Sequence, residues 1–260
     1  MALWGYNSAN WLVAFFAIVR AGGVALLVNY SMGVEEAAAL LRDARARFVV
    51  CGDNGQTKRS EDALTRLADA CGIALERCVD ARAAVSDLVG AYADADPLPE
   101  QRAESEAGDT AFVIFTSGTT SRPKAVCVSQ RALTADAVAL ASGLEGTLGG
   151  SACVAVPLFH ILGLLTSYVY LMHGATVCLP QSYRPEALCA MIGAHGVSDM
   201  AAVGAVYQGL ADAEGFAERV VPHVRTCLIA GGMSTPVQMM RLELAFANAT
   251  FVNMYGQSEG

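Results

Sequence analysis

The chain has 260 residues, enough for one large domain or two modest ones with their own cores. Hydrophobic residues make up 54% of it and charged residues only 16%, which excludes a disordered chain. The net charge of −8 and the pI of about 5.0 argue against a nucleic-acid partner. Any site for an anion must therefore be locally basic.

The 8 cysteines are scattered, with no CxxC pair and no histidine at metal-ligand spacing. This pattern indicates neither a zinc site nor a disulfide framework, and it favours a reducing, cytoplasmic setting. The N-terminus has no basic region followed by an apolar one, so no signal peptide is predicted. Residues 146–183 carry no charge, but prolines, glycines and histidines interrupt them. The helix-like piece Ile161–Met172 is shorter than the ~18 residues of a membrane span, so we expect no transmembrane segment.

Helices alternate with short apolar strands in the first part of the chain. Ser8 can cap a helix whose apolar positions share one face and which ends at Gly22 and Gly23. The elements expected next are a strand over 24–28, a helix over 34–44, a strand over 48–51 and a helix over 61–70. This alternation is typical of a mostly parallel sheet covered on both faces.

The stretch Phe112–Val128, FVIFTSGTTSRPKAVCV, follows an acidic surface connection over 94–110. Its order of β-formers, hydroxyls and β-formers predicts a strand, an anion-binding loop and a strand. Gly118 lets the backbone approach an anion, and Lys124 adds a positive charge beside Pro123. Hydroxyl donors next to successive amide groups come from Thr116, Ser117, Thr119 and Thr120.

An ordinary Ser/Thr turn explains the hydroxyl cluster equally well. A Walker-type P-loop is excluded, because GxxxxGK[ST] is absent and the loop leads into a strand instead of a helix. One observation favours an anion site. Lys58 and Lys124 are the only lysines among 17 basic residues, and lysine is a usual partner of phosphate.

The second part of the chain again alternates helices and strands. A helix capped by Ser129 is expected over 130–140, and the glycine-rich stretch 143–151 suggests a boundary between domains 1–145 and 146–260. The elements expected after it are strands over 152–156, 175–179, 226–230 and 250–254 and helices over 161–172, 185–194 and 235–246.

His160 lies in Pro157–Gly163, PLFHILG, where a lone histidine among apolar residues is usually a core residue. His173, His195 and His223 are interpreted in the same structural way. Near the C-terminal end, Gly231, Gly232 and Met233 follow an expected strand, where two glycines permit close approach of a ligand or simply a turn.

The segment YGQSE closes the series of candidate binding elements. Tyr255 offers a flat face to a purine, Ser258 a hydroxyl to a phosphate, and Glu259 a hard oxygen ligand to Mg²⁺.

TSGTTSRPK, residues 116–124, resembles the signature loop of the adenylate-forming superfamily, which includes acyl-CoA synthetases, the adenylation domains of peptide synthetases, and luciferases. NSANWLVAFFAIVRAGGVALLVN, PLFHILG, AGGM and YGQSE are similar to further elements of that family, in the same order. Ser121 and Ala125 stand where the family usually has glycine, and Ser258 stands where it usually has threonine.

The resemblance implies two packed α/β subdomains with mostly parallel sheets, as in the N-terminal domain of acyl-CoA synthetases, truncated at both ends. It assigns residues 116–120 and Lys124 to the β- and γ-phosphates of ATP, and His160 to the border of the carboxylate and acyl site. The nucleotide-binding and metal-binding residues that it implies in the last part are Gly231, Gly232, Met233, Tyr255, Gly256, Gln257 and Ser258, with Glu259 as the ligand of Mg²⁺.

The resemblance also implies a reaction in which a carboxylic acid and ATP give an acyl-adenylate, with coenzyme A as the expected acceptor. An amino-acid adenylation domain is an alternative, although such domains usually carry an aspartate near PLFHILG, which has no acid. A non-catalytic nucleotide-binding or interaction module is a second alternative. Family members continue past YGxTE into a small C-terminal domain, so we expect a fragment that does not complete turnover alone.

Overall fold

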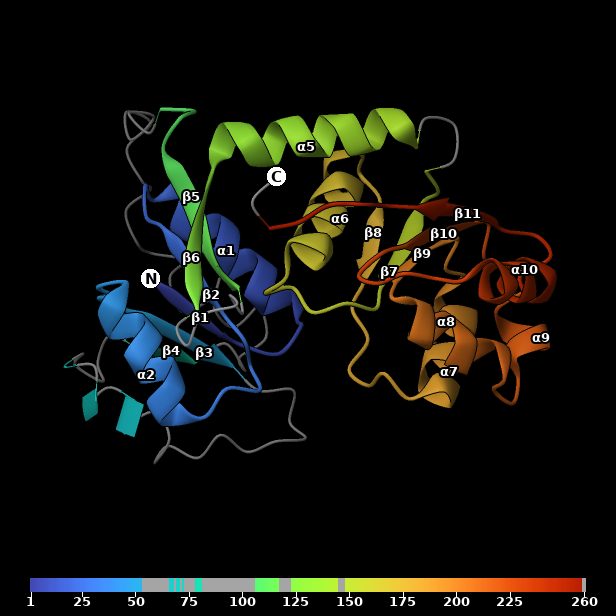
Figure 1. The fold of residues 1–260 in the computed structure, drawn as a ribbon, viewed down its shortest axis with the longest axis horizontal. Helices are drawn as coiled ribbons and strands as arrows, with labels where there is room; N and C mark the ends of the chain where they lie inside the picture. The colour runs from blue at the N-terminus through green and yellow to red at the C-terminus, as the bar shows by residue number, and fades with distance from the viewer. Residues whose placement is uncertain are drawn as a thin grey trace, which may run out of the picture. The chain divides into compact units, whose positions relative to one another are not determined.

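The structure is a computed structural model that describes residues 1–52, 66–67, 69–70, 72, 78–80, 106–116, 123–144 and 148–258. The chain divides into two compact units, 1–133 and 134–258, and each contains one sheet (Figure 1). The division falls within helix α5 (Gln130–Gly143), and the domain boundary at 145/146 stays a prediction. The helix expected over 61–70 and the connection over 94–110 lie mostly outside the described residues.

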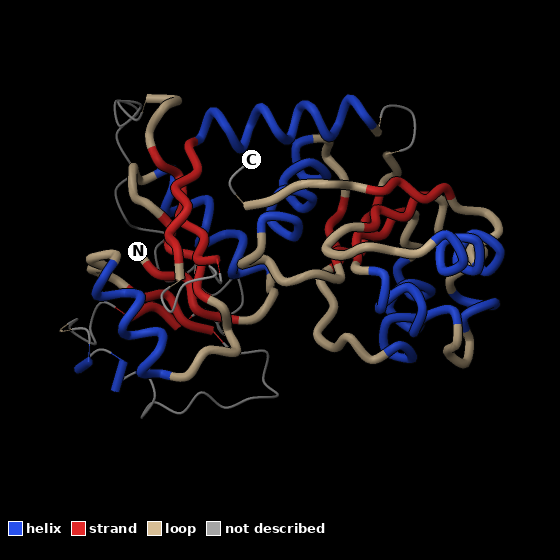
Figure 2. The backbone as a smooth tube through the Cα atoms, in the orientation of Figure 1, coloured by secondary structure: helices blue, strands red, loops and turns tan. Residues whose placement is uncertain are grey.

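The first unit contains a six-stranded sheet in the order β4-β3-β1-β2-β5-β6. Figure 2 shows the strands of both units in red. All neighbouring strands are parallel except β5 and β6, which form an antiparallel hairpin. The strands are β1 (Ala2–Gly5), β2 (Ala25–Val28), β3 (Val49–Gly52), β4 (Cys78–Asp80), β5 (Thr110–Thr116) and β6 (Lys124–Ser129).

Helices cover both faces of this sheet, as the alternating pattern predicts. Trp4 and Val28 face α2 (Val34–Asp43), where they join Leu41 in one buried cluster. On the opposite face Phe112 meets Phe15 of α1 (Ala9–Arg20), with ring centroids 5.7 Å apart. Alternate residues of a strand point to opposite faces, so a strand buried on both sides must be apolar throughout.

The second unit contains a five-stranded, fully parallel sheet in the order β11-β10-β9-β7-β8. Its strands are β7 (Ser151–Val154), β8 (Thr176–Cys178), β9 (Asp199–Ala202), β10 (Thr226–Ile229) and β11 (Thr250–Asn253). Its helices after α5 are α6 (Ile161–Met172), α7 (Pro185–His195), α8 (Gly204–Ala211), α9 (Phe216–Arg219) and α10 (Pro236–Ala245).

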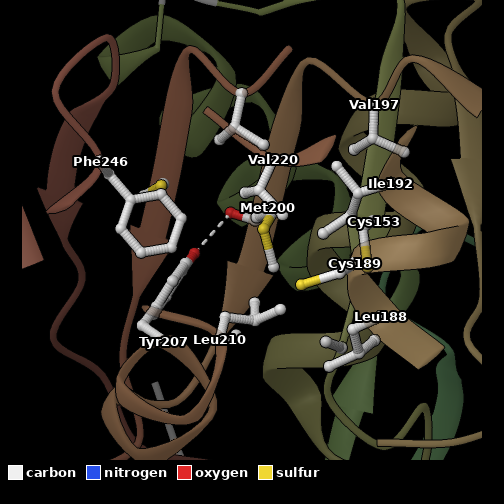
Figure 3. Close-up of a cluster of buried hydrophobic side chains, with 14 of the residues drawn as sticks. Cys153, Leu188, Cys189, Ile192, Val197, Met200, Tyr207, Leu210, Val220 and Phe246 are labelled. Carbon is white, nitrogen blue, oxygen red and sulfur yellow. Dashed lines mark hydrogen bonds between the residues drawn. The ribbon is translucent and has the colours of Figure 1, made fainter. Parts of the chain in front are cut away.

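Two apolar clusters hold the helices against this second sheet. The larger one joins strand side chains such as Met200 and Cys153 to α7 and α8, through residues that include Ile192 and Tyr207 (Figure 3). The smaller one packs Tyr170 of α6 on the other face of the sheet, together with Ala201 and Leu228. Burial of this apolar surface is the main favourable term in folding.

The two helix caps expected from the sequence are present. The Ser8 Oγ accepts a hydrogen bond from the Trp11 amide at 3.1 Å, and the Ser129 Oγ accepts one from the Ala132 amide at 3.1 Å. Helix α6 has the predicted ends, Ile161 and Met172. No helix in the described part of the chain is long and apolar enough to cross a membrane.

The buried hydroxyl of Tyr207 bridges two strands. It lies 2.9 Å from the Met200 carbonyl oxygen of β9 (Figure 3) and 2.9 Å from the Leu228 carbonyl oxygen of β10. We expect Tyr207→Phe to lower the free energy of unfolding by about 1–2 kcal/mol, because the buried hydroxyl proton that these two carbonyl oxygens share is lost. Urea unfolding measures this difference. Tyr255→Phe removes the same hydroxyl from a fully exposed residue and should change nothing, so equal stability of the two variants would contradict the bridging role.

Candidate active site

Four chain segments follow strands of the second sheet. Residues 157–163 come after β7, 203–204 after β9, 231–233 after β10 and 255–258 after β11. Because these strands are parallel, their carboxyl ends lie on the same side of the sheet. Open α/β sheets bind their ligands just outside these carboxyl ends. The parallel topology therefore gathers three predicted binding elements and adds a fourth.

The turns after β9 and β10 are in direct contact. Gly231 has a φ of 80°, and a Cβ on it would lie 3.0 Å from Val203 Cγ1. A Cβ on Gly204 would lie 3.2 Å from Ser234 Oγ. The sequence assigns no site to residues 200–210, whose apolar character core packing explains equally well. The signal that points to this turn is Gly204, a glycine directly after an apolar strand.

Gly163, the glycine of PLFHILG, has no room for a side chain. Gly163 lies in the first turn of α6, and a Cβ there would lie 2.3 Å from the Pro157 carbonyl oxygen and 2.8 Å from its carbon. The His160 amide donates to the same Pro157 oxygen at 3.2 Å. Helix α6 thus begins pressed against the turn that leaves β7, and this contact fixes the place of His160 at the helix start.

His160 is the N-cap residue of α6, with extended backbone angles. The residue is exposed, but its ring rests on Phe159 with centroids 4.3 Å apart. Partial burial of the ring lowers the pKa of His160 below its usual value, so the imidazole is neutral at neutral pH. A neutral imidazole can donate one hydrogen bond and accept another without bringing a charge to the site.

The side chains expected to contact a nucleotide are accessible. Tyr255 and Met233 are fully exposed, Gly231, Gly232, Gly256 and Gln257 are exposed, and Ser258 is half-buried. Glu259 lies outside the described residues. In the described part of the chain, no group of three or more His, Cys, Asp or Glu side chains is placed to hold a metal ion.

The remaining candidate residues belong to the hairpin β5–β6 of the first unit. Thr116 and Lys124 are directly opposite each other in its antiparallel register, so the loop between them starts and ends at one cross-strand pair. Lys124 is exposed, and no acidic residue of the described ranges forms an ion pair with it. The predicted flanking strands are confirmed. The loop residues Ser117, Gly118, Thr119 and Thr120 lie outside the described residues, and their role stays a prediction.

The close approach at Gly163 can be tested by adding one methyl group. We expect Gly163→Ala to lower the free energy of unfolding by about 1–3 kcal/mol, because the neighbouring atoms are backbone and cannot move aside without distorting the turn. Chemical denaturation measures the effect. Gly143→Ala is the matched control. Gly143 is the last residue of α5, a Cβ on it would meet no atom within 4 Å, and the substitution should be neutral or slightly stabilising. If the two variants were equally stable, the contact would not be the reason for glycine.

Comparison with known proteins identifies the family of this chain. All of the chain, residues 1–260, matches the family described as AMP-binding enzyme. An oxalate–CoA ligase of Arabidopsis thaliana is 28% identical over 97% of this chain and 49% of its own length. A feruloyl-CoA synthase of Amycolatopsis is 28% identical over 100% of this chain and 49% of its own length.

A solved structure has the same fold. The inhibitor-bound N-terminal domain of FACL13 from Mycobacterium tuberculosis superposes with a TM-score of 0.83 at 22% identity, covering 100% of this chain and 63% of that one. The α/β fold with two mostly parallel sheets, expected from the sequence, is confirmed. The chain spans about half the length of the curated relatives it matches. It belongs to the family of AMP-binding enzymes.

Proposed function

We propose that this chain forms the substrate-binding half of a ligase that activates a carboxylic acid with ATP and transfers the acyl group to coenzyme A. One observation carries the proposal. PLFHILG, AGGM and YGQS all lie at the carboxyl ends of parallel strands, in a member of the AMP-binding enzyme family. The curated relatives described above are named as CoA ligases and synthetases, which supports this reaction class.

The first reaction is a displacement at phosphorus. A carboxylate oxygen of the substrate attacks the α-phosphorus of ATP, the bond to the bridging oxygen breaks, and pyrophosphate leaves with the electron pair. Catalysis of this kind rests on positioning and on charge neutralisation. Lys124 supplies a positive charge to the β- and γ-phosphates, and Thr116 begins the loop whose amides and hydroxyls bind them. The coenzyme A thiol then attacks the acyl carbonyl, and AMP leaves.

The second unit provides the acyl and adenine contacts. His160 borders the carboxylate, and its neutral ring can donate one hydrogen bond to a carboxylate oxygen. Tyr255 stacks on the purine with its fully exposed ring, and Gly231, Gly232 and Met233 supply further contacts to the nucleotide. Gly256 and Gln257 continue this surface to Ser258, which donates to the α-phosphate.

Mg²⁺ would be held by Glu259 and by phosphate oxygens, in keeping with its preference for one or two carboxylates and its substrate. When bound, the ion neutralises phosphate charge. Glu259 itself lies outside the described residues, so its role as the ligand of Mg²⁺ rests on the resemblance of YGQSE to the family's element.

The rival function is a nucleotide-binding or interaction module without catalysis. The combination of Lys124, Ser258 and Glu259 favours an enzyme, because a purely structural remnant has no need of all three. The small C-terminal domain that adenylate-forming enzymes carry is expected in the full-length protein, and activity is therefore to be measured in the longest protein that the reading frame encodes.

Loss of Lys124 should greatly reduce activation of the acid. We expect Lys124→Ala to lower acid-dependent exchange of labelled pyrophosphate into ATP by about 100- to 1,000-fold, the usual loss when one electrostatic donor is removed from a transition state. Arg131→Ala removes an exposed positive charge from the start of α5 and is the control. Unchanged exchange in Lys124→Ala would refute its role. Exchange that is absent from the unsubstituted protein would favour the non-catalytic module.

The substrate class can be tested with a panel of acids. PLFHILG carries no acidic residue to pair with an amine, so we expect simple carboxylic acids to support exchange and amino acids to fail. The measurement is the same exchange with each acid in turn. A protein that activated amino acids alone would be an adenylation domain of the other branch.

A further inference from the structure

Met233 is the most exposed methionine in the described part of the chain. Its side chain is fully exposed, whereas Met240 is 56% exposed, Met172 is 45% exposed and Met200 has no exposed surface. A single apolar side chain on the surface is ordinary in proteins. What distinguishes Met233 is its place at the carboxyl end of β10, in the turn that the candidate active site includes.

The turn around Met233 is anchored on both sides. On one side Gly231 has a φ of 80° and lies against Val203, since a Cβ on this glycine would be 3.0 Å from Val203 Cγ1. On the other side the Ser234 Oγ lies only 3.2 Å from the place of a Cβ on Gly204. Met233 stands between these two contacts and projects into solvent.

The start of α10 is fixed as well. The Thr235 amide donates to the Gln238 Oε1 at 2.8 Å, and the Gln238 amide donates to the Thr235 Oγ1 at 3.3 Å. These reciprocal bonds form a capping box, which fixes the first turn of the helix. The exposure of Met233 is therefore built into the turn, because a withdrawal of this side chain into the core would disturb the contacts on either side.

A thioether is the one apolar side-chain group that mild oxidants convert into a polar one. A sulfur lone pair attacks one oxygen of hydrogen peroxide and the O–O bond breaks. The proton of the attacked hydroxyl passes to the departing hydroxide, which leaves as water. Sulfur is oxidised by two electrons to the sulfoxide, and the peroxide is reduced. A leucine fills a similar volume but does not react in this way.

We propose that Met233 is a peroxide-sensitive modification site, and that its oxidation weakens binding of the nucleotide. The inference rests on the proposed function, in which Met233 contacts the nucleotide. Its thioether offers an apolar, polarisable surface to the purine, whereas a sulfoxide brings a strongly hydrated oxygen that loses water on contact. Met240 lies within α10 and Met172 ends α6, so their oxidation should leave nucleotide binding unchanged.

Limited oxidation with hydrogen peroxide tests the site in the longest protein that the reading frame encodes. Mass spectrometry of its peptides should find sulfoxide first at Met233, later at Met240 and Met172, and last at the buried Met200. In the same samples, the ATP concentration that half-saturates pyrophosphate exchange should rise by up to about tenfold, with little change in the maximal rate. Methionine sulfoxide reductase should reverse the rise.

Three variants separate Met233 from the other oxidisable residues. In Met233→Leu the half-saturating ATP concentration, whatever its level before treatment, should not respond to peroxide. Met240→Leu is the matched control, and it should respond as the unsubstituted protein does. Met233→Gln places a polar group of similar length in the turn, so it should raise the half-saturating concentration without any oxidant.

Sulfoxide that formed at Met240 before Met233 would overturn the proposal. So would a response to peroxide that persisted in Met233→Leu, or a half-saturating concentration that stayed the same after Met233 was oxidised. A rise that the reductase did not reverse would exclude sulfoxide as its cause. Exchange that is present but indifferent to oxidation of Met233 removes this inference alone, whereas exchange that is absent before treatment removes the proposed function and the inference with it.

Discussion

The parallel pairing of β7, β9, β10 and β11 is the constraint on which the rest of the second unit depends. Parallel strands must each return through a connection that crosses a face of the sheet, so helices cover both sides. The central strands β9 and β10 are buried throughout. Ile229 pairs with Ala202 on one side and with Asn253 on the other, so neighbouring strands end level. The segments that follow these strands therefore start side by side, which brings residues that are distant in the sequence together at the carboxyl ends.

The carboxyl and amino ends of these strands differ in chemistry. At the carboxyl ends, Gly163, Gly204 and Gly231 provide room for backbone and side chains that approach closely. The exposed side chains of the same segments are accessible to a ligand. At the amino ends of the strands, Ser198 Oγ donates to the Ser151 carbonyl oxygen, and Asp199 accepts a hydrogen bond from the Gly149 amide. These hydrogen bonds join the start of β7 and the residues before it to the start of β9.

The elements that could be predicted from the sequence are those with local signals. Helix α6 follows a proline-containing turn and ends before Gly174, and Ser8 and Ser129 are side chains whose capping role needs no distant partner. Strand β9 was not predicted as a separate element, because an aspartate at its start opposes strand propensity and only tertiary burial makes it part of a core.

The order of the binding motifs could likewise be predicted, whereas their contacts could not. The approach of Gly163 to the Pro157 carbonyl and of Gly204 to Ser234 depends on how a helix sits on a strand end. Short strands also escape pattern reasoning. Strand β4 (Cys78–Asp80) is too brief to show alternation, and strand β1 (Ala2–Gly5) lacks the preceding helix that marks the start of β2 and β3. Both nevertheless pair within the first sheet.

The topology of the first sheet also bears on the route by which the chain folds. Strands β5 and β6 are neighbours in sequence, so this hairpin can form from local contacts in microseconds. Its attachment to the sheet is different, because β5 pairs with β2 through Ala25 and Phe112, across a long intervening stretch of chain. The entropy of closing that loop must be lost before the pairing is gained, which makes non-local strands slow to join. The strand that begins at Lys124 therefore completes its own hairpin early and becomes part of the sheet late.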